Sequence, residues 1–130
     1  MLALHRATHH TLHALSTALA AENLTAAEIN ALANLADGVP NVRELADRTG
    51  TRATTLTGVL DRLENRGYLT RELDAADRRS FRLPLTEAGQ AVAARVRAAI
   101  ADLEREALNG LSASQTDGFR AVIRALQEAC

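Results

Sequence analysis

The sequence predicts a mainly α-helical protein with one small two-stranded β-hairpin, and three observations lead to this fold class. Apolar residues make up 47% of the 130 residues and aromatic residues only 2%, so the core is expected to consist of aliphatic side chains and alanine, the best helix former. Apolar residues recur at helical spacing over most of the chain. Between residues 68 and 85 the pattern changes to partial alternation, which is typical of strands.

Three helices are expected in the first part of the chain. Leucines at helical spacing predict a helix from about residue 3 to 21: Leu4, Leu12, Leu15 and Leu19. A second helix follows Thr25, which forms a capping-box pattern with Glu28, and it ends at Gly38. The third is a short helix of about two turns between its cap, Asn41, and Gly50.

A fourth helix is predicted at about residues 52–65, with Thr51 as its cap and Gly67 just past its end. One face carries an apolar stripe: Leu56, Leu60 and Leu63. The other side carries small polar residues and a glycine: Thr54, Thr57, Gly58 and Asp61. This helix therefore presents an outer face of small polar groups.

The segments "YLTREL" and "SFRLPL" predict two short antiparallel strands, and the polar segment "DAADRRS" between them predicts a mobile tip. Pro84 has no backbone N–H to donate, so it makes the second strand an edge strand or marks its end. The hairpin is therefore expected to carry two adjacent arginines, Arg78 and Arg79, at its tip.

Two further helices complete the predicted fold. Thr86 is expected to cap a long helix and Ser112 the last one. Their apolar stripes are Val92, Val96, Ile100 and Leu103 in the long helix, and Phe119, Val122, Ile123, Leu126 and Cys130 in the last. The stripes on the first helix and on these two exceed what one small core buries, so a second chain is expected to cover them.

The elements between Thr25 and Leu85 have the order of a winged helix-turn-helix, in which the second helix enters the major groove of DNA and a hairpin follows. Three stretches of this part resemble the MarR family of bacterial transcriptional regulators. They are "LTAAEINALANLA", "VRELADRTGTRATTLTGVLDRLENRGYLTRE" and "DRRSFRLPLTEAG", the last with an Asp-Arg-Arg wing followed by Leu-Thr-x-x-Gly. The resemblance covers about Leu24 to Gly89.

The resemblance implies a homodimer that binds double-stranded DNA at a pseudo-palindromic operator. Residues 1–23 and 87–130 would be dimerisation helices, and residues 24–86 the DNA-binding domain. It also implies a repressor of its own or a neighbouring promoter, relieved by a small phenolic or anionic ligand. No cofactor is expected, and no nucleophile–base or carboxylate pair indicates an enzyme.

The same resemblance, followed residue by residue, assigns the DNA contacts. In the recognition helix they are Arg52, Thr54, Thr55, Thr57 and Gly58. Threonine cannot read a base through two hydrogen bonds, so direct readout is expected to be weak and to rest on Arg52, unless Arg52 only binds phosphate or a nearby acid. In the wing, the resemblance implies that Asp77 pairs with an arginine and that Arg79 enters the minor groove.

Other arginines have different expected roles. Arg78 is expected to bind phosphate or an acid of its own chain, and the alternative is that Arg78 and Arg79 only keep the loop soluble. Four residues are predicted to form structural ion pairs: Asp61, Arg62, Arg66 and Arg71.

Two alternative functions remain open at this point. His5, His9 and His13 share a helical face and suggest a metal-responsive regulator, completed by Glu22, Glu28 or another subunit; the alternative is a solvated or dimer-packed stripe. The net charge of −1, and the lack of a side chain at Gly58 on the outer face of the predicted recognition helix, suggest a different function. In this alternative the winged helix serves only as a protein-interaction module.

The single cysteine, Cys130, excludes a disulfide within the chain and is interpreted as a packing residue or a frayed end. No apolar stretch approaches the roughly 20 residues of a membrane span, and no secretion signal is evident at the start. A cytoplasmic protein is therefore expected.

Overall fold

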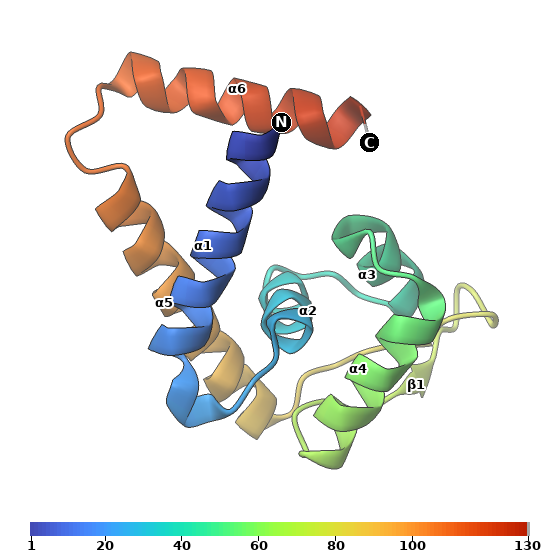
Figure 1. The fold of residues 1–130 in the computed structure, drawn as a ribbon. Helices are drawn as coiled ribbons and strands as arrows, with labels where there is room; N and C mark the ends of the chain where they lie inside the picture. Colours follow the sequence, from blue (N-terminus) through green and yellow to red (C-terminus); the bar gives the residue numbers. More distant parts are fainter. Residues whose placement is uncertain (130) are drawn as a thin grey trace.

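A computed structural model describes residues 1–129, so the interpretation of Cys130 lies outside the described residues. The elements are α1 (Leu2–Ala18), the short 3-10 helix η1 (Ala20–Glu22), α2 (Ala26–Ala36), α3 (Val42–Thr49), α4 (Ala53–Asn65), β1 (Glu72–Leu73), β2 (Phe81–Arg82), α5 (Glu87–Ala107) and α6 (Ala113–Ala129) (Figure 1). The predicted class, mainly helical with a small two-stranded wing, is confirmed.

Side-chain caps begin four of the helices, as the sequence predicts. The side chains of Thr25, Asn41 and Thr86 accept hydrogen bonds from the backbone N–H three residues further on, and Ser112 accepts one from Gln115. The prediction that Thr51 caps α4 is wrong. The residue before α4 is Arg52, in an extended conformation and without a side-chain cap, so Thr51 lies one position too early.

One hydrophobic core joins α2, α3, α4, the base of the wing and the first half of α5. Its most fully buried side chains are Leu32, Leu45, Leu56, Leu63, Leu69, Val59 and Val96. The predicted apolar stripe of α4 lies in this core, which leaves the opposite face of α4 exposed. Figure 1 shows α2 at the centre, between α5 on one side and α3 and α4 on the other.

The wing is an antiparallel hairpin in which Glu72 pairs with Arg82 and Leu73 with Phe81. Its regular strands have two residues each and are shorter than the segments that the alternation suggests. Isolated bridges extend the pairing, one between Leu69 and Leu85 at the base and one between β2 and Asn41 ahead of α3. Phe81 is 42% exposed, because the outer part of the hairpin has no layer of structure beneath it.

Gly89 lets α5 begin directly against the turn after α4. A Cβ atom at this position would lie 1.7 Å from the carbonyl oxygen of Tyr68, so no other residue fits without moving the backbone. The N–H of Thr86 donates a hydrogen bond to the same carbonyl at 3.0 Å. The glycine weakens the helix locally but joins α5 to the winged part of the fold.

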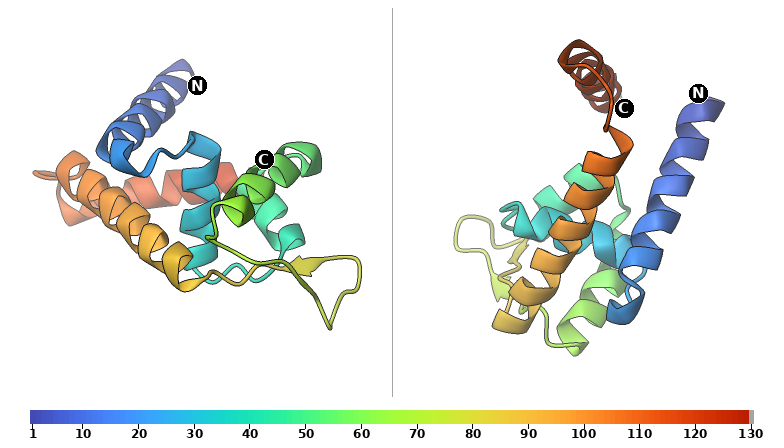
Figure 2. Two further views of the ribbon diagram at one scale, coloured as in Figure 1. Left: turned by 90° about the horizontal axis from the view of Figure 1, so that it is seen from below. Right: turned by 90° about the vertical axis from the view of Figure 1, so that its left-hand side faces the viewer.

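The terminal helices extend away from this core. α1 runs beside α5, and α6 lies at the far end of α5 from the wing (Figure 2). Neither α1 nor α6 contains a buried residue, and Phe119 and Val122 of α6 are largely exposed. Within residues 1–129, no helix combines the length and apolarity that crossing a membrane requires.

Candidate nucleic-acid interface

The helix-turn-helix is formed by α3 and α4. Gly50 ends α3 with a φ of +61°, a left-handed conformation that glycine adopts without strain, and the chain then turns into α4. Thr54, Thr55 and Thr57 are exposed on α4, and Gly58 is half-buried. The Thr57 hydroxyl donates to the carbonyl of Ala53 at 2.8 Å, so its proton is engaged within the helix.

Arg52 lies exposed at the start of this surface. Arg52 forms no ion pair within residues 1–129. The alternative role, in which Arg52 pairs with a nearby acid, is therefore not observed in the described residues. Its charge is therefore available to a phosphate or a base.

Asp77 organises the tip of the wing. Its Oδ1 accepts a hydrogen bond from the Arg79 N–H at 3.0 Å, and its carbonyl accepts one from the Ser80 N–H at 3.0 Å. Its Oδ2 lies 3.6 Å from Nη1 of Arg43 on α3. The expected carboxylate–arginine pair is present, and its partner is an arginine that the sequence did not single out.

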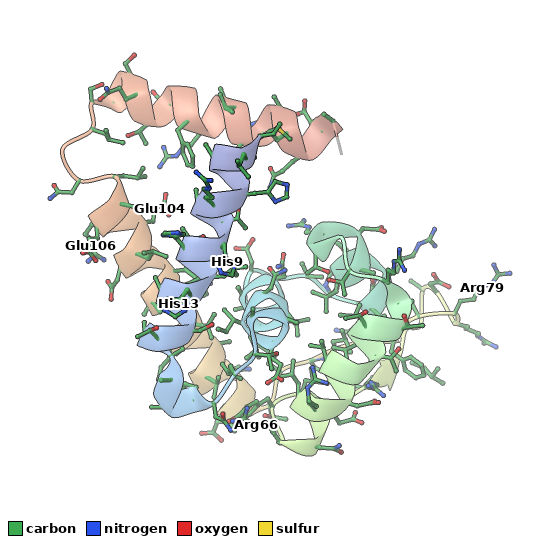
Figure 3. The ribbon with its side chains drawn as sticks, viewed as in Figure 1. His9, His13, Arg66, Arg79, Glu104 and Glu106 are labelled. Carbon is green, nitrogen blue, oxygen red and sulfur yellow. The ribbon has the colours of Figure 1, made fainter. Side chains whose placement is uncertain are left out.

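The two arginines at the tip are exposed, and Figure 3 shows the Arg79 side chain directed away from the body of the protein. No acid among residues 1–129 forms an ion pair with Arg78 or Arg79. Of the two partners expected for Arg78, the acid of its own chain is therefore not found.

Asp74 was missed by the sequence analysis and holds the base of the wing. This buried carboxylate accepts hydrogen bonds from the Ala76 N–H at 3.0 Å and from Nδ2 of Asn41 at 3.4 Å. The first is a local turn contact of the kind that Asp often makes with the backbone N–H two residues further on, so the sequence could have suggested it. The second spans 33 positions and leaves no signal in the sequence, yet it joins the wing to the residue that caps α3.

The four predicted structural ion-pair residues are engaged as expected. Arg71 Nη2 lies 2.5 Å from Oδ1 of Asp61. Arg62 and Arg66 both pair with Glu28, at 3.0 Å and 3.6 Å. These contacts connect α4 to the residue just before β1 and to α2.

The histidines are exposed on α1, where Figure 3 labels His9 and His13. In the part of the chain that the structure describes, no three His, Cys, Asp or Glu side chains are grouped as a metal site requires. The acids suggested as further ligands have other partners, since Glu22 pairs with Arg95 and Glu28 with Arg62. One chain therefore does not assemble the site that the histidine spacing suggested.

A hollow of about 380 Å³ lies between α1, α2 and α5. Its lining is mostly aliphatic: Thr8, Leu12, Leu15, Ala26, Ala27, Ile29, Asn30, Ala33 and Ile100. The side chain of Tyr68 lies under the guanidinium of Arg66, with 4.9 Å between the ring centre and Cζ.

These elements define a winged helix-turn-helix of the DNA-binding class. They are the short helix α3, the exposed helix α4, and a hairpin whose turn is held by Asp77 and whose two tip arginines have no ion-pair partner within residues 1–129. A family model described as "MarR family" matches residues 22–80. Among solved structures, the PcaV transcriptional regulator from Streptomyces coelicolor, in complex with its natural ligand, is 29% identical, with a TM-score of 0.77 over 98% of this chain and 90% of that one.

Two other structures are similar over nearly the whole chain. A probable transcriptional regulator from Pseudomonas aeruginosa is 28% identical, with a TM-score of 0.79 over 96% of this chain and 94% of that one. CouR from Rhodococcus jostii RHA1, bound to p-coumaroyl-CoA, is 24% identical and shares the fold, with a TM-score of 0.84 over 95% and 88%. The chain is thus similar in sequence over residues 22–80, and in fold over nearly its whole length, to the MarR family, whose members are DNA-binding transcriptional regulators and not enzymes.

Proposed function

We propose that this protein is a homodimeric repressor that binds a pseudo-palindromic operator at its own or a neighbouring promoter and leaves it when a small phenolic or anionic ligand binds. The observation that carries the proposal is the wing, where Asp77 fixes the turn through the Arg79 N–H and leaves the Arg79 guanidinium free at the tip. A loop that only kept the protein soluble would not need a carboxylate that holds its turn in place.

The wing and α4 have different parts in this proposal. Arg79 enters a narrow minor groove, whose negative potential attracts a guanidinium, and Arg78 binds a flanking phosphate. Arg52 contacts guanine or phosphate at the start of α4. Thr54 and Thr55 contribute phosphate or methyl contacts, Thr57 contributes its methyl group, and Gly58 beside them has no side chain. Threonines discriminate bases less sharply than arginine does, so the wing supplies a large share of the affinity.

The terminal segments, residues 1–23 and 87–130, form the dimerisation part, and residues 24–86 the DNA-binding part. The exposed apolar residues of α1 and α6 support this division, because a second copy would remove them from water. A two-fold axis then places two α4 helices on successive major grooves, about 34 Å apart.

Ligand response is supported by the PcaV structure, which contains that protein's natural ligand, and by the aliphatic hollow between α1, α2 and α5. A small phenol or carboxylate fits a mostly apolar cavity of this size. As a regulator of transcription the protein acts in the cytoplasm.

The test is a titration of the protein on duplex DNA from upstream of its own gene and on random duplex of the same length, at several salt concentrations. We expect tighter binding to the upstream DNA and a steep fall of log affinity with log salt, because arginines displace counterions from phosphate. Equal binding to both duplexes at every salt concentration would contradict the proposed repressor.

A further inference from the structure

A buried carboxylate joins α2 to the recognition helix. Glu28 is 3% exposed, and its Oε1 accepts hydrogen bonds from the Thr25 hydroxyl at 3.1 Å and from Nε of Arg62 at 3.0 Å. Its Oε2 lies 3.6 Å from Nη1 of Arg66. A charge withdrawn from water in this way is stable only while its partners stay in place, so the position of α4 is tied to that of α2.

Arg66 also connects α4 to the segment between α1 and α2. It occupies the C-cap of α4, and its guanidinium donates hydrogen bonds to the carbonyl oxygen of Asn23 at 2.9 Å and to that of Glu22 at 2.7 Å. One side chain thus contacts a buried carboxylate and two backbone carbonyls in the connection between α1 and α2. The planar, multiply donating guanidinium suits this task, and an ammonium group does not reproduce it.

The connection is itself fastened to α5. The carboxylate of Glu22 accepts hydrogen bonds from Arg95, one of them at 3.2 Å from Nη2 to Oε2. Hydrogen bonding to Glu22 raises the pKa of Arg95 above its usual value. Figure 3 shows Arg66 at the end of α4 nearest to the first turns of α5. The C-terminal end of α4 is therefore linked, through Arg66 and Glu22, to the helices outside the winged domain.

We propose that Glu28 and Arg66 are positioning residues that hold α4 at one angle to α1 and α5 and so determine which half-site spacing the dimer accepts. This inference rests on the proposed function, because it takes the two α4 helices to be related by a dimer axis that α1, α5 and α6 form. Neither residue contacts DNA in this proposal. Their effect is on the distance and direction between the two recognition helices.

Spacing is a sensitive readout of that geometry. One inserted base pair moves the second half-site by about 3.4 Å and turns it by about 34°, since one turn of about 10.5 base pairs spans about 34–36 Å. If the two recognition helices are held rigidly, the altered spacing lowers the affinity for DNA strongly. If the angle between them can adjust, the affinity falls less. A residue that only stabilises the fold would lower the affinity for every spacing by the same factor.

The experiment uses the full chain and an operator that the wild type has selected from random duplex DNA. Affinities are measured on this operator and on versions with one base pair removed, one added or two added between the half-sites. The deciding variant is Arg66→Lys, which keeps the charge and leaves the Arg62–Glu28 pair intact. Glu28→Gln is the second variant, and Asp102→Asn is its control, because it makes the same change of charge in an exposed pair with Arg105 on α5.

We expect Arg66→Lys to bind the selected operator about fivefold more weakly and to lose most of the wild-type preference over the altered spacings, as residues within one network do. Glu28→Gln should act in the same direction, and Asp102→Asn should keep the wild-type preference. An unchanged preference in Arg66→Lys, or an equal loss of affinity at all spacings, overturns the inference while DNA binding stands. If the wild type selects no sequence, the proposed function fails as well.

Discussion

The part of the chain from α2 to the first half of α5 buries its own apolar side chains, whereas α1 and α6 contain no buried residue. The first part has a continuous core and buried polar contacts at Glu28 and Asp74. The second exposes apolar side chains such as Val122, at 58%. The difference indicates that one chain is sufficient to bury the apolar residues of the part proposed to bind DNA. Burial of the exposed apolar residues on the terminal helices would require the second chain of the proposed dimer.

The core substitution Leu32→Ala should have the largest effect. Leu32 is fully buried in α2, and its truncation should lower the free energy of unfolding by about 2–5 kcal/mol through lost burial and the cavity left behind. Leu2→Ala in α1 is the control and should cost less than about 0.5 kcal/mol, because Leu2 is exposed. Denaturant unfolding at low protein concentration measures both, and equal effects would contradict the contrast between the two parts.

Arg79→Ala should leave stability unchanged and weaken operator binding by about 1–3 kcal/mol, as the loss of one specific contact does. Arg124→Ala removes the same charge from exposed α6 and should change affinity little. Thr57→Ala should also have a small effect, because the Thr57 hydroxyl is already engaged with Ala53. Titrations at constant salt measure the three, and an unchanged affinity in Arg79→Ala would refute a minor-groove role.

Val122→Ser should act on association and not on the winged part. Replacing this exposed valine should weaken the dimer by about 1–2 kcal/mol, since about that much is gained when such a side chain is buried. Ala121→Ser, about 100° around α6 from Val122 and outside the apolar stripe by helical spacing, is the matched control. Sedimentation equilibrium measures the dissociation constants, and a monomeric wild type would remove the basis of the comparison.

Gly58→Ala should have the smallest effect and the opposite sign. A Cβ atom at Gly58 would lie 3.6 Å from Nη1 of Arg62, an ordinary contact, so the helix can accept it. Alanine should then stabilise the fold by about 0.5–1 kcal/mol. Thermal unfolding checks this prediction, and destabilisation would show that Arg62 needs the open space to reach Glu28.

The sequence was sufficient for features that depend on neighbouring residues. Thr25, Asn41, Thr86 and Ser112 mark helix starts because a cap acts on an N–H three residues away. The exception, Thr51, is one position off, since a propensity does not fix which residue turns first. The wing arginines were also evident from the sequence, because their order and their position after a helix-turn-helix are local patterns.

Tertiary structure alone decided which distant residues meet. Asp77 pairs with Arg43 across 34 positions and Asp74 with Asn41 across 33. Glu28 pairs with Arg62 of α4 and with Arg66 at its C-cap, across 34 and 38 positions. Glu28 was identified as part of a capping box and as a possible metal ligand, and only the packing of α2 against α4 made it a buried ion-pair centre. Such pairings depend on how elements pack and leave no periodicity, so the sequence supplies the charged groups while the fold selects their partners.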